Sequence, residues 1–309
     1  MTDDLTTACG VVAVIGAPNA GKSTLVNALV GQKVAIVSAK AQTTRARLMG
    51  IALAETGETT GKIGVQIILA DTPGIFEPRR RLDRAMVAAA WEGTSEADAI
   101  LLVIDARKKR LDDLEPILES LRTRPERKLL VLNKVDQCVK EKLLVTAQAF
   151  GEMALFDEIF FVSALTGDGV PELKAHLAKA MPPGPWHFPE DQVSDASERL
   201  LACEITREQL YRQLHDELPY DSTVRPESYT LRKDGSLEIH QQIVITRDSQ
   251  KSIVLGKGGA RIKAIGEASR KELSELLGIK VHLFIHVKVD EKWADAKEIY
   301  EEIGLDWVR

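Results

Sequence analysis

The chain has 309 residues, of which 44% are hydrophobic and 28% are charged, and its formal net charge is −5. These proportions are close to globular averages and exclude a disordered or fibrous chain. Because no global excess of positive charge indicates a nucleic-acid partner, any such partner must be bound by a local basic patch.

Chain length, cysteine spacing and the lack of a visible targeting signal indicate how many domains to expect and in which compartment. At roughly 100–200 residues per domain, the length predicts about two domains. The three cysteines, Cys9, Cys138 and Cys203, lie far apart and form no CxxC pair, which is typical of a reducing compartment. The acidic N-terminus lacks the apolar core of a signal peptide, and no apolar run approaches the ~18 residues that span a bilayer. We therefore expect a cytoplasmic protein with no integral membrane segment.

In the first half of the chain, short apolar runs alternate with helical patterns. We expect buried strands at residues 11–15, 99–104, 128–132 and 158–162, with helices that include residues 22–30 and 171–180. This alternation is typical of an α/β domain whose mostly parallel sheet is covered on both faces. Residues 47–54 and 62–70 flank the segment ETGETTG and are predicted to form an antiparallel hairpin at the edge of that sheet.

Residues 16–23 read GAPNAGKS and fit the phosphate-binding pattern G-x-x-x-x-G-K-[ST] between a strand and a helix. In such a loop the backbone N–H groups surround phosphate oxygens, and the helix N-terminus adds its positive dipole end. Lys22 would reach the β- and γ-phosphates, and the Ser23 hydroxyl would ligate Mg²⁺. The alternative is an ordinary Gly-rich turn. The predicted nucleotide contacts here are Gly16, Ala17, Pro18, Asn19, Ala20, Gly21, Lys22, Ser23 and Thr24.

Residues 71–74 read DTPG and end the strand 62–70. Asp71 would hold Mg²⁺ through a water molecule, and the Gly74 N–H would meet the γ-phosphate, with Thr72 and Pro73 completing the contact. Alone, DTPG is an ordinary turn, but its position one strand after the phosphate-binding loop favours a nucleotide site.

Between these two motifs lies KAQTTR, residues 40–45. A switch segment must supply a hydroxyl to Mg²⁺ and the γ-phosphate, and Thr43 and Thr44 are the candidates. A surface turn is the alternative.

Residues 133–136 read NKVD and follow the strand 128–132. Guanine carries two adjacent donors, N1–H and the 2-amino group, and the Asp136 carboxylate would accept both. Adenine lacks this arrangement and would leave a desolvated carboxylate unpaired, so the motif favours guanine. Asn133 would brace the phosphate-binding loop, and the stem of Lys134 would stack on the base.

Two other strand ends carry weaker signals. Ser163 and Ala164 follow the strand 158–162 and are predicted to offer a backbone N–H to guanine O6, or else to form a common turn. Asp105 follows the strand 99–104 without a preceding Asn-Lys pair, so we interpret it as a strand-end cap.

A proline-rich segment, MPPGPWHFPED at residues 181–191, divides the chain. Its prolines remove backbone donors and favour extended geometry. We predict a nucleotide-binding domain at 8–182, a linker at 183–196 and a second domain at 197–309. The second domain is expected to contain a helix at 197–214, strands at 223–232 and 236–247, helices within 250–277, a strand at 279–289 and a last helix at 291–303.

The sequence LGKGGARIK at residues 255–263 contains a G-x-x-G loop between two predicted helices. A KH domain uses such a loop to let the nucleotide backbone approach closely. Residues 247–271 carry seven cations and two anions, whereas residues 200–309 carry 17 cations and 19 anions, so positive charge is concentrated at the loop. The alternative is a solvated helix face after a turn. The predicted RNA contacts are Lys251, Gly256, Lys257, Gly258, Gly259, Arg261 and Lys263.

The motifs GAPNAGKS, KAQTTR, DTPG and NKVD resemble the Era family of ribosome-assembly GTPases, and VLGKGGARIKAIG is similar to the KH segment that closes those proteins. The resemblance spans nearly the full chain. It implies an α/β P-loop GTPase domain followed by an α+β type II KH domain, with GTP or GDP and Mg²⁺ as cofactors and Thr44 as the Mg²⁺ ligand.

The same resemblance implies partners. It implies GTP hydrolysis coupled to binding near the 3′ end of small-subunit (16S-type) rRNA, in support of small (30S) ribosomal subunit biogenesis and rRNA processing. Family members are associated with the periphery of the inner membrane, and we expect a monomer.

One departure from Ras-like GTPases concerns hydrolysis, because Ile75 stands where a glutamine would orient water. Related GTPases with Pro-Asn in the phosphate-binding loop hold K⁺ there in place of an arginine finger. Asn19 would then join Lys22, Thr44 and Gly74 as catalytic candidates, or it would only shape the turn.

Two other functions stay open. One is a GTPase of another TRAFAC family, acting in tRNA modification or transport, with an RNA-binding tail; those families lack a C-terminal KH segment. The other is a non-catalytic RNA-binding adaptor, against which the intact Lys22, Ser23, Asp71 and Asp136 argue.

Overall fold

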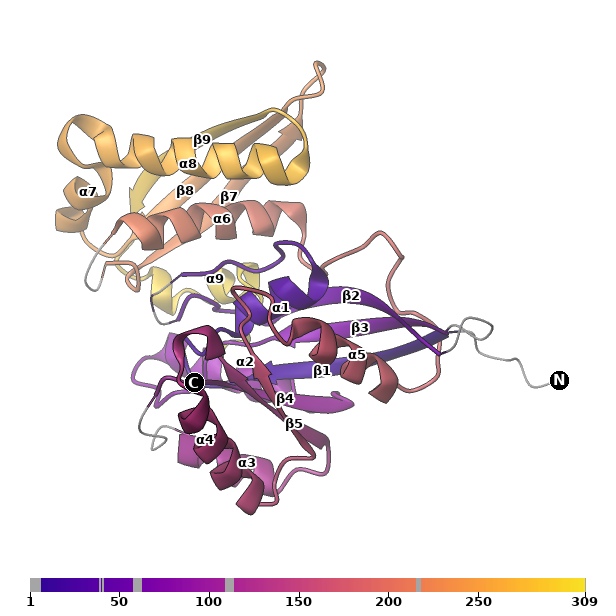
Figure 1. Cartoon of the computed structure of the whole chain (residues 1–309). Helices are drawn as coiled ribbons and strands as arrows, with labels where there is room; N and C mark the ends of the chain where they lie inside the picture. The colour runs from indigo at the N-terminus through magenta and orange to yellow at the C-terminus, as the bar shows by residue number, and fades with distance from the viewer. Residues whose placement is uncertain are drawn as a thin grey trace. The chain divides into compact units, whose positions relative to one another are not determined.

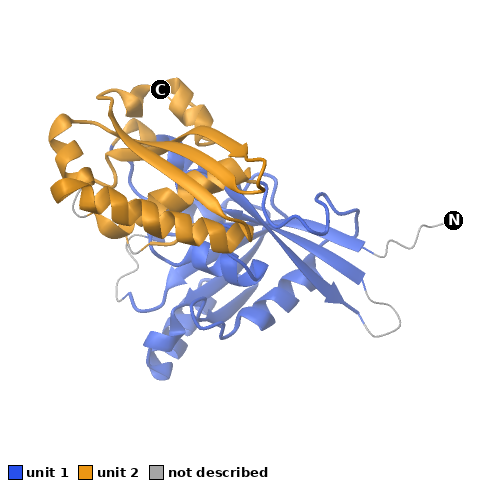
Figure 2. Ribbon diagram, turned by 90° about the horizontal axis from the view of Figure 1, so that it is seen from above, with its two compact units in different colours: residues 1–35, 44–79, 83–195 blue, residues 36–43, 80–82, 196–309 orange. Residues whose placement is uncertain are grey.

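The computed structural model describes residues 7–38, 40, 42–57, 63–108, 114–214 and 218–308, and Figure 1 traces their helices and strands. The chain divides into two compact units. Unit 1 comprises residues 1–35, 44–79 and 83–195, and unit 2 comprises residues 36–43, 80–82 and 196–309 (Figure 2). Each unit is built on its own sheet.

Unit 1 contains a six-stranded sheet in the order β2-β3-β1-β4-β5-β6. Every neighbouring pair is parallel except β2 with β3, which confirms the α/β fold and the edge hairpin. The predicted turn of that hairpin includes residues 58–62, which lie outside the described residues. The strands are β1 (Thr7–Ile15), β2 (Leu48–Thr56), β3 (Ile63–Asp71), β4 (Ala99–Asp105), β5 (Arg127–Asn133) and β6 (Glu158–Val162).

Helices cover both faces of this sheet because successive side chains of a buried strand point to opposite faces. Along β1, Val12 and Val14 pack in a core with α1 and α5, whereas Ala13 and Ile15 pack in a second core with α2, α3 and α4. The helices are α1 (Lys22–Val30), α2 (Arg81–Glu92), α3 (Glu115–Arg122), α4 (Lys140–Glu152) and α5 (Val170–Ala180).

The proline-rich segment 181–191 belongs to unit 1 and is hydrogen-bonded to β3, the strand next to the edge strand β2. Gln66, a fully buried polar residue of β3, accepts the N–H groups of His187 and Phe188 and donates to the Phe188 carbonyl. Trp186 Nε1 donates to Gly64 O at 3.2 Å. These bonds supply the partners that the extended segment cannot supply for itself.

Unit 2 contains a three-stranded sheet in the order β7-β8-β9, antiparallel between β7 and β8 and parallel between β8 and β9. The helices α6, α7 and α8 pack their apolar residues against it, as the predicted α-β-β-α-α-β order requires. None of the helices within the described ranges is long and apolar enough to cross a membrane. The elements are α6 (Glu198–Gln213), β7 (Ser222–Leu231), β8 (Leu237–Ile245), α7 (Asp248–Leu255), α8 (Ala260–Leu277), β9 (Val281–Val289) and α9 (Lys297–Glu302).

The prediction of one last helix over 291–303 is wrong. A 3₁₀ turn at Trp293–Asp295 and the short helix α9 are separated by Ala296, which is extended. Trp293 is buried, and its Nε1 donates to Asp221 O at 3.2 Å, so burial of the indole stops the helix before α9.

Candidate nucleotide and RNA sites

The phosphate-binding loop connects β1 to α1 at the carboxyl edge of the unit 1 sheet. Because β1, β3, β4, β5 and β6 run parallel, their carboxyl ends meet at this same edge. Two glycines make the loop sterically feasible. A Cβ on Gly16 would lie 2.3 Å from Val103 O, and one on Gly21 would lie 2.2 Å from Asn133 Nδ2. Both also adopt positive φ, which favours glycine.

Lys22 is buried beneath this loop at the start of α1. Its Nζ donates to the carbonyls of Gly16 and Ala17, each at 3.2 Å. Burial lowers the pKa of Lys22 to about 8, although the nearby Asp71 opposes the shift. A desolvated ammonium held against the loop is placed to meet phosphate oxygens.

Asp71, Ser23 and Thr44 together fit a Mg²⁺ site. Asp71 is fully buried, and neither carboxylate oxygen has a hydrogen-bond partner among the described residues. Burial raises the pKa of Asp71 to about 6, against the opposing influence of Ser23 and Lys22. The Ser23 and Thr44 hydroxyl oxygens lie 2.8 Å apart. A buried carboxylate without a partner calls for a cation, and hydroxyl and carboxylate oxygens are donors that Mg²⁺ accepts.

The two candidate threonines of the switch segment have different partners. Thr44 lies beside Ser23, as the Era resemblance implies. The Thr43 hydroxyl instead donates to Lys40 O at 2.8 Å and lies 2.6 Å from the Ser38 hydroxyl, within unit 2. The structure therefore brings Thr44, and not Thr43, to the Mg²⁺ candidate.

The DTPG segment packs directly on the phosphate-binding loop. Thr72 donates to Val14 O at 2.8 Å, and Ile75 N donates to Gly16 O at 3.1 Å. A Cβ on Gly74 would lie 2.8 Å from Pro18 Cγ, so only glycine allows this approach. Pro73 is buried with its neighbours.

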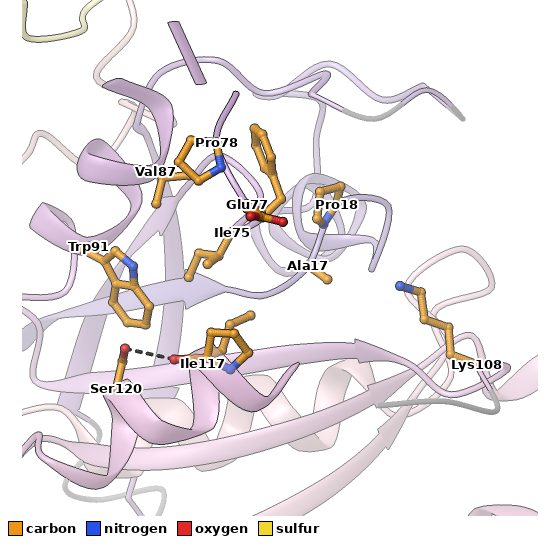
Figure 3. A pocket seen from close by; sticks show the side chains of 12 residues that line it. Ala17, Pro18, Ile75, Glu77, Pro78, Val87, Trp91, Lys108, Ile117 and Ser120 are labelled. Atoms are coloured by element: carbon orange, nitrogen blue, oxygen red, sulfur yellow. Dashed lines mark hydrogen bonds between the residues drawn. The ribbon is translucent and has the colours of Figure 1, made fainter. Parts of the chain in front are cut away.

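Ile75 is only 8% exposed and belongs to the core that α2, α3 and α4 form. Its side chain lines an apolar pocket of about 830 Å³ between the loop residues Ala17 and Pro18 and the helix residues Trp91 and Ile117 (Figure 3). An aliphatic side chain in this position cannot orient a water molecule.

A second pocket, of about 200 Å³, lies at the NKVD motif. Asn133 Nδ2 donates to Ala20 O at 2.9 Å, and Asn133 Oδ1 accepts the Ala164 N–H at 3.0 Å, so one side chain joins three loops. Lys134 Nζ donates to Asn19 O at 2.6 Å, which places the stem of Lys134 across the phosphate-binding loop. The lining residues are Gly21, Thr24, Arg107, Asn133, Lys134, Asp136, Gln137, Ser163, Ala164 and Leu165.

Sequence reasoning missed three features of this pocket. Ser163 is the main influence that lowers the pKa of the Asp136 carboxyl, so the side chain of Ser163, and not only its backbone, belongs to the pocket. Arg107 lines the pocket. Asp105 caps its own turn as predicted, accepting Arg107 N at 3.1 Å, but it also accepts Lys134 Nζ at 2.9 Å. The parallel pairing of Asp105 with Asn133 explains the contact with Lys134, because it places the ends of β4 and β5 side by side.

The G-x-x-G loop of unit 2 joins α7 to α8. Gly256, Gly258 and Gly259 all have positive φ, at 71°, 59° and 79°. A Cβ on Gly256 would lie 2.8 Å from Arg261 Cβ, whereas a Cβ on Gly258 or Gly259 would meet no atom within 4 Å. The loop therefore presents two bare backbone positions to solvent.

The predicted cations surround this loop. Lys251, Lys257 and Lys263 are exposed, and Arg261 is half-buried with its guanidinium donating to Ile253 O. Ile253 itself is 48% exposed on α7, an apolar group beside the loop that sequence reasoning missed. Backbone approach, positive charge and one apolar contact are the elements by which a KH loop holds single-stranded RNA.

Fold and sites together define a P-loop GTPase that carries a KH domain. A family model described as a 50S ribosome-binding GTPase matches residues 11–134, and a KH domain model matches residues 217–294. The chain belongs to the Era family of GTPases: it is 73% identical to GTPase Era of Erythrobacter litoralis (strain HTCC2594) over 301 residues, which cover 97% of this chain and 98% of that protein.

Further relatives agree. GTPase Era of Bradyrhizobium sp. (strain BTAi1) is 55% identical over 303 residues, covering 98% of this chain and 96% of that protein. Era in complex with MgGDPNP and nucleotides 1506–1542 of 16S ribosomal RNA superposes with a TM-score of 0.87 at 36% identity, over 96% of this chain and 99% of that one. An Aquifex aeolicus Era variant bound to GDP·AlF4⁻ gives the same TM-score, identity and coverage.

Proposed function

We propose that this GTPase binds 16S-type rRNA near its 3′ end and assists small (30S) ribosomal subunit biogenesis and rRNA processing. The observation that carries the proposal is the bare, basic G-x-x-G loop of unit 2. It is supported by likeness over 96% of the chain to an Era structure that contains nucleotides 1506–1542 of 16S rRNA.

In this proposal GTP and Mg²⁺ operate the switch. The Ser23 and Thr44 hydroxyls would hold Mg²⁺, and Asp71 would hold it through water, so that the buried carboxylate would gain a partner. Lys22 and the Gly74 N–H would contact the γ-phosphate, Asp136 would select guanine, and Asn133 braces the phosphate-binding loop. Hydrolysis removes the γ-phosphate contacts and releases the Thr44 and Gly74 segments.

Because no glutamine is present to orient water, we assign to K⁺ at Asn19 the stabilisation of charge during GTP hydrolysis. The buried position of Ile75 supports the need for another group, and the side-chain oxygen of Asn19 suits a hard monovalent cation. Asn19 has a φ of 61°, a conformation that asparagine tolerates, so a role confined to shaping the turn is the competing proposal.

We place the protein in the cytoplasm as a monomer. Peripheral association with the inner membrane stays a prediction from the family resemblance.

Crosslinking the protein to total cellular RNA and sequencing the bound fragments tests the RNA partner. We expect fragments from the 3′ end of small-subunit rRNA. Enrichment of transfer RNA instead would favour the tRNA-modification alternative and contradict the proposal.

A further inference from the structure

Asp105 ends β4 beside Asn133 of β5, and its side chain is only 7% exposed. Its oxygens accept four hydrogen bonds within unit 1. Three come from Arg107, through the backbone N at 3.1 Å, Nε at 2.9 Å and Nη2 at 2.7 Å. The fourth comes from Lys134 Nζ at 2.9 Å. Capping the turn explains only the first of these bonds.

The neighbouring charges stabilise the ionised form of the Asp105 carboxylate. Burial by itself would raise the pKa of Asp105, but the hydrogen bonds from Arg107 and Lys134 outweigh it and hold that pKa well below its usual range. The carboxylate is therefore ionised at every physiological pH, and its attraction for the Lys134 ammonium is permanent.

Lys134 is the residue that this carboxylate constrains. Its Nζ lies between Asp105 Oδ2 at 2.9 Å and Asn19 O at 2.6 Å, and its Cε lies 3.7 Å from the position of a Cβ on Gly21. The stem is thus stretched over the phosphate-binding loop at the floor of the base pocket. An unanchored lysine stem would lose much of its rotamer freedom on binding nucleotide, and this loss of entropy would weaken the affinity for nucleotide.

We propose that Asp105 is a positioning residue of the guanine site, which holds Lys134 across the phosphate-binding loop so that its stem is ready to stack on the base. The proposal rests on the assignment of Asn133, Lys134 and Asp136 to the base. Arg107 secures Asp105 from the solvent side, and its Nη1 donates to Gln137 Oε1 at 2.7 Å next to Asp136.

The test measures release of a fluorescent GDP analogue from the full chain with Mg²⁺. Asp105→Asn keeps an acceptor for Arg107 N but removes the charge, so dissociation should accelerate about tenfold, the usual effect of losing a hydrogen bond to a charged group. Arg107→Gln should accelerate it less than about threefold, because its side chain is 44% exposed. Asp157→Asn is the matched control: Asp157 accepts Lys128 N at 2.9 Å at the opposite end of the β5–β6 pair, and its loss should leave the rate unchanged.

A double-mutant cycle separates positioning from mere structural support. If Asp105 acts through Lys134, Asp105→Asn should add no further acceleration in a Lys134→Met background. Thermal unfolding of the nucleotide-free variants checks folding. A lowered melting temperature with parental release rates, or full additivity in the cycle, would overturn the proposal.

A variant with altered base preference, Asp136→Asn, tests the role of Asp105 separately from the assignment of Asp136 to guanine. Asp136→Asn should turn the preference toward xanthosine nucleotides, and its failure to do so would count against the assignment, whatever Asp105 does. In the Asp136→Asn background, Asp105→Asn should accelerate release of xanthosine diphosphate by the same factor as it accelerates GDP release in the parent, since stacking is independent of the base edge. An effect confined to GDP would contradict positioning through Lys134.

Discussion

At the scale of single residues, the nucleotide site depends on charges that are buried before any ligand binds. Asp71 and Lys22 lie at the carboxyl edge of the sheet, and burial shifts both pKa values toward neutrality, one upward and one downward. Each shift indicates that the charged form lacks full compensation. Bound Mg²⁺ would stabilise the ionised Asp71, and bound phosphate would stabilise the protonated Lys22, so ligand binding would offset the cost of burying both charges.

The proposed guanine recognition depends on the Asp136 carboxylate and its neighbour Ser163. Ser163 is the main influence that lowers the pKa of Asp136, and in Asp136→Asn its hydroxyl would donate to the amide oxygen and leave the amide NH₂ to face the base. We expect GTP affinity to fall roughly hundredfold, since an acceptor of two donors is lost, and xanthosine triphosphate to bind instead. Nucleotide titrations of parent and variant measure this. Unchanged base preference would show that Asp136 does not read guanine.

Potassium dependence is the prediction that concerns Asn19. Single-turnover GTP hydrolysis should be faster in potassium than in sodium at matched ionic strength, because K⁺ at the side-chain oxygen would stabilise charge between the β- and γ-phosphates. Asn19→Gly should lose this acceleration and still bind nucleotide. Glycine adopts the φ of 61° without strain, which makes it a sharper test than Asn19→Ala. Equal rates of the parent in the two salts would eliminate the K⁺ mechanism.

At the scale of elements, α6 is unusual because it buries a run of polar residues. Arg207 is 2% exposed and Glu208 is fully buried. Besides its partner on α6, each of the two has a partner on residues 36–43, which belong to the same unit: Arg207 donates to Thr43 O, and Glu208 accepts Val37 N at 3.2 Å. Lys40 Nζ donates to Leu214 O at 2.6 Å at the C-terminal end of α6. The segment preceding Thr44 is thus held by a helix of the KH unit.

Arg207→Met tests this attachment. Removing the buried guanidinium leaves Thr43 O and Glu204 without their donor, so unit 2 should lose roughly 3 kcal/mol of unfolding free energy. Cleavage by trypsin after Lys40 should become faster. Arg199→Met, at an exposed position of the same helix, should change stability by less than about 0.5 kcal/mol. Equal protection of Lys40 in parent and Arg207→Met would show that Arg207 does not hold the segment.

At the scale of the whole molecule, the nucleotide site and the RNA-binding loop belong to two units, each with its own hydrophobic core. The proposed phosphate, Mg²⁺ and base contacts lie in unit 1, and the G-x-x-G loop lies in unit 2. Substitutions confined to one loop should therefore affect one ligand only.

Gly258→Asp should abolish RNA binding and leave GTP affinity unchanged. At a φ of 59°, aspartate is tolerated, and a Cβ there meets no atom within 4 Å, so the fold should persist while charge and bulk repel the RNA backbone. Gly235→Asp is the matched control, because Gly235 in the β7–β8 turn has a φ of 79° and equally open space. RNA titrations at one salt concentration compare the three proteins. Equal RNA affinity of parent and Gly258→Asp would contradict the KH assignment.

Most of the architecture was predictable from the sequence, because its causes are local. The strands of unit 1 are apolar on both faces and the motifs stand at their ends, so the parallel sheet and the phosphate-binding edge follow from pattern alone. The same holds for the G-x-x-G loop between α7 and α8. The broken last helix was not predictable, since it depends on where Trp293 is buried.

Only the tertiary structure decided which side chains meet across elements. Asp105 and Lys134 are 29 residues apart and become partners because β4 and β5 pair in parallel with Asp105 opposite Asn133. Arg207 and Thr43 are 164 residues apart, and nothing in α6 by itself indicates what covers its buried arginine. A sequence pattern determines which face of an element is apolar, because burial is repeated along the element. A single polar pair is decided by strand order and register, which no local repeat encodes.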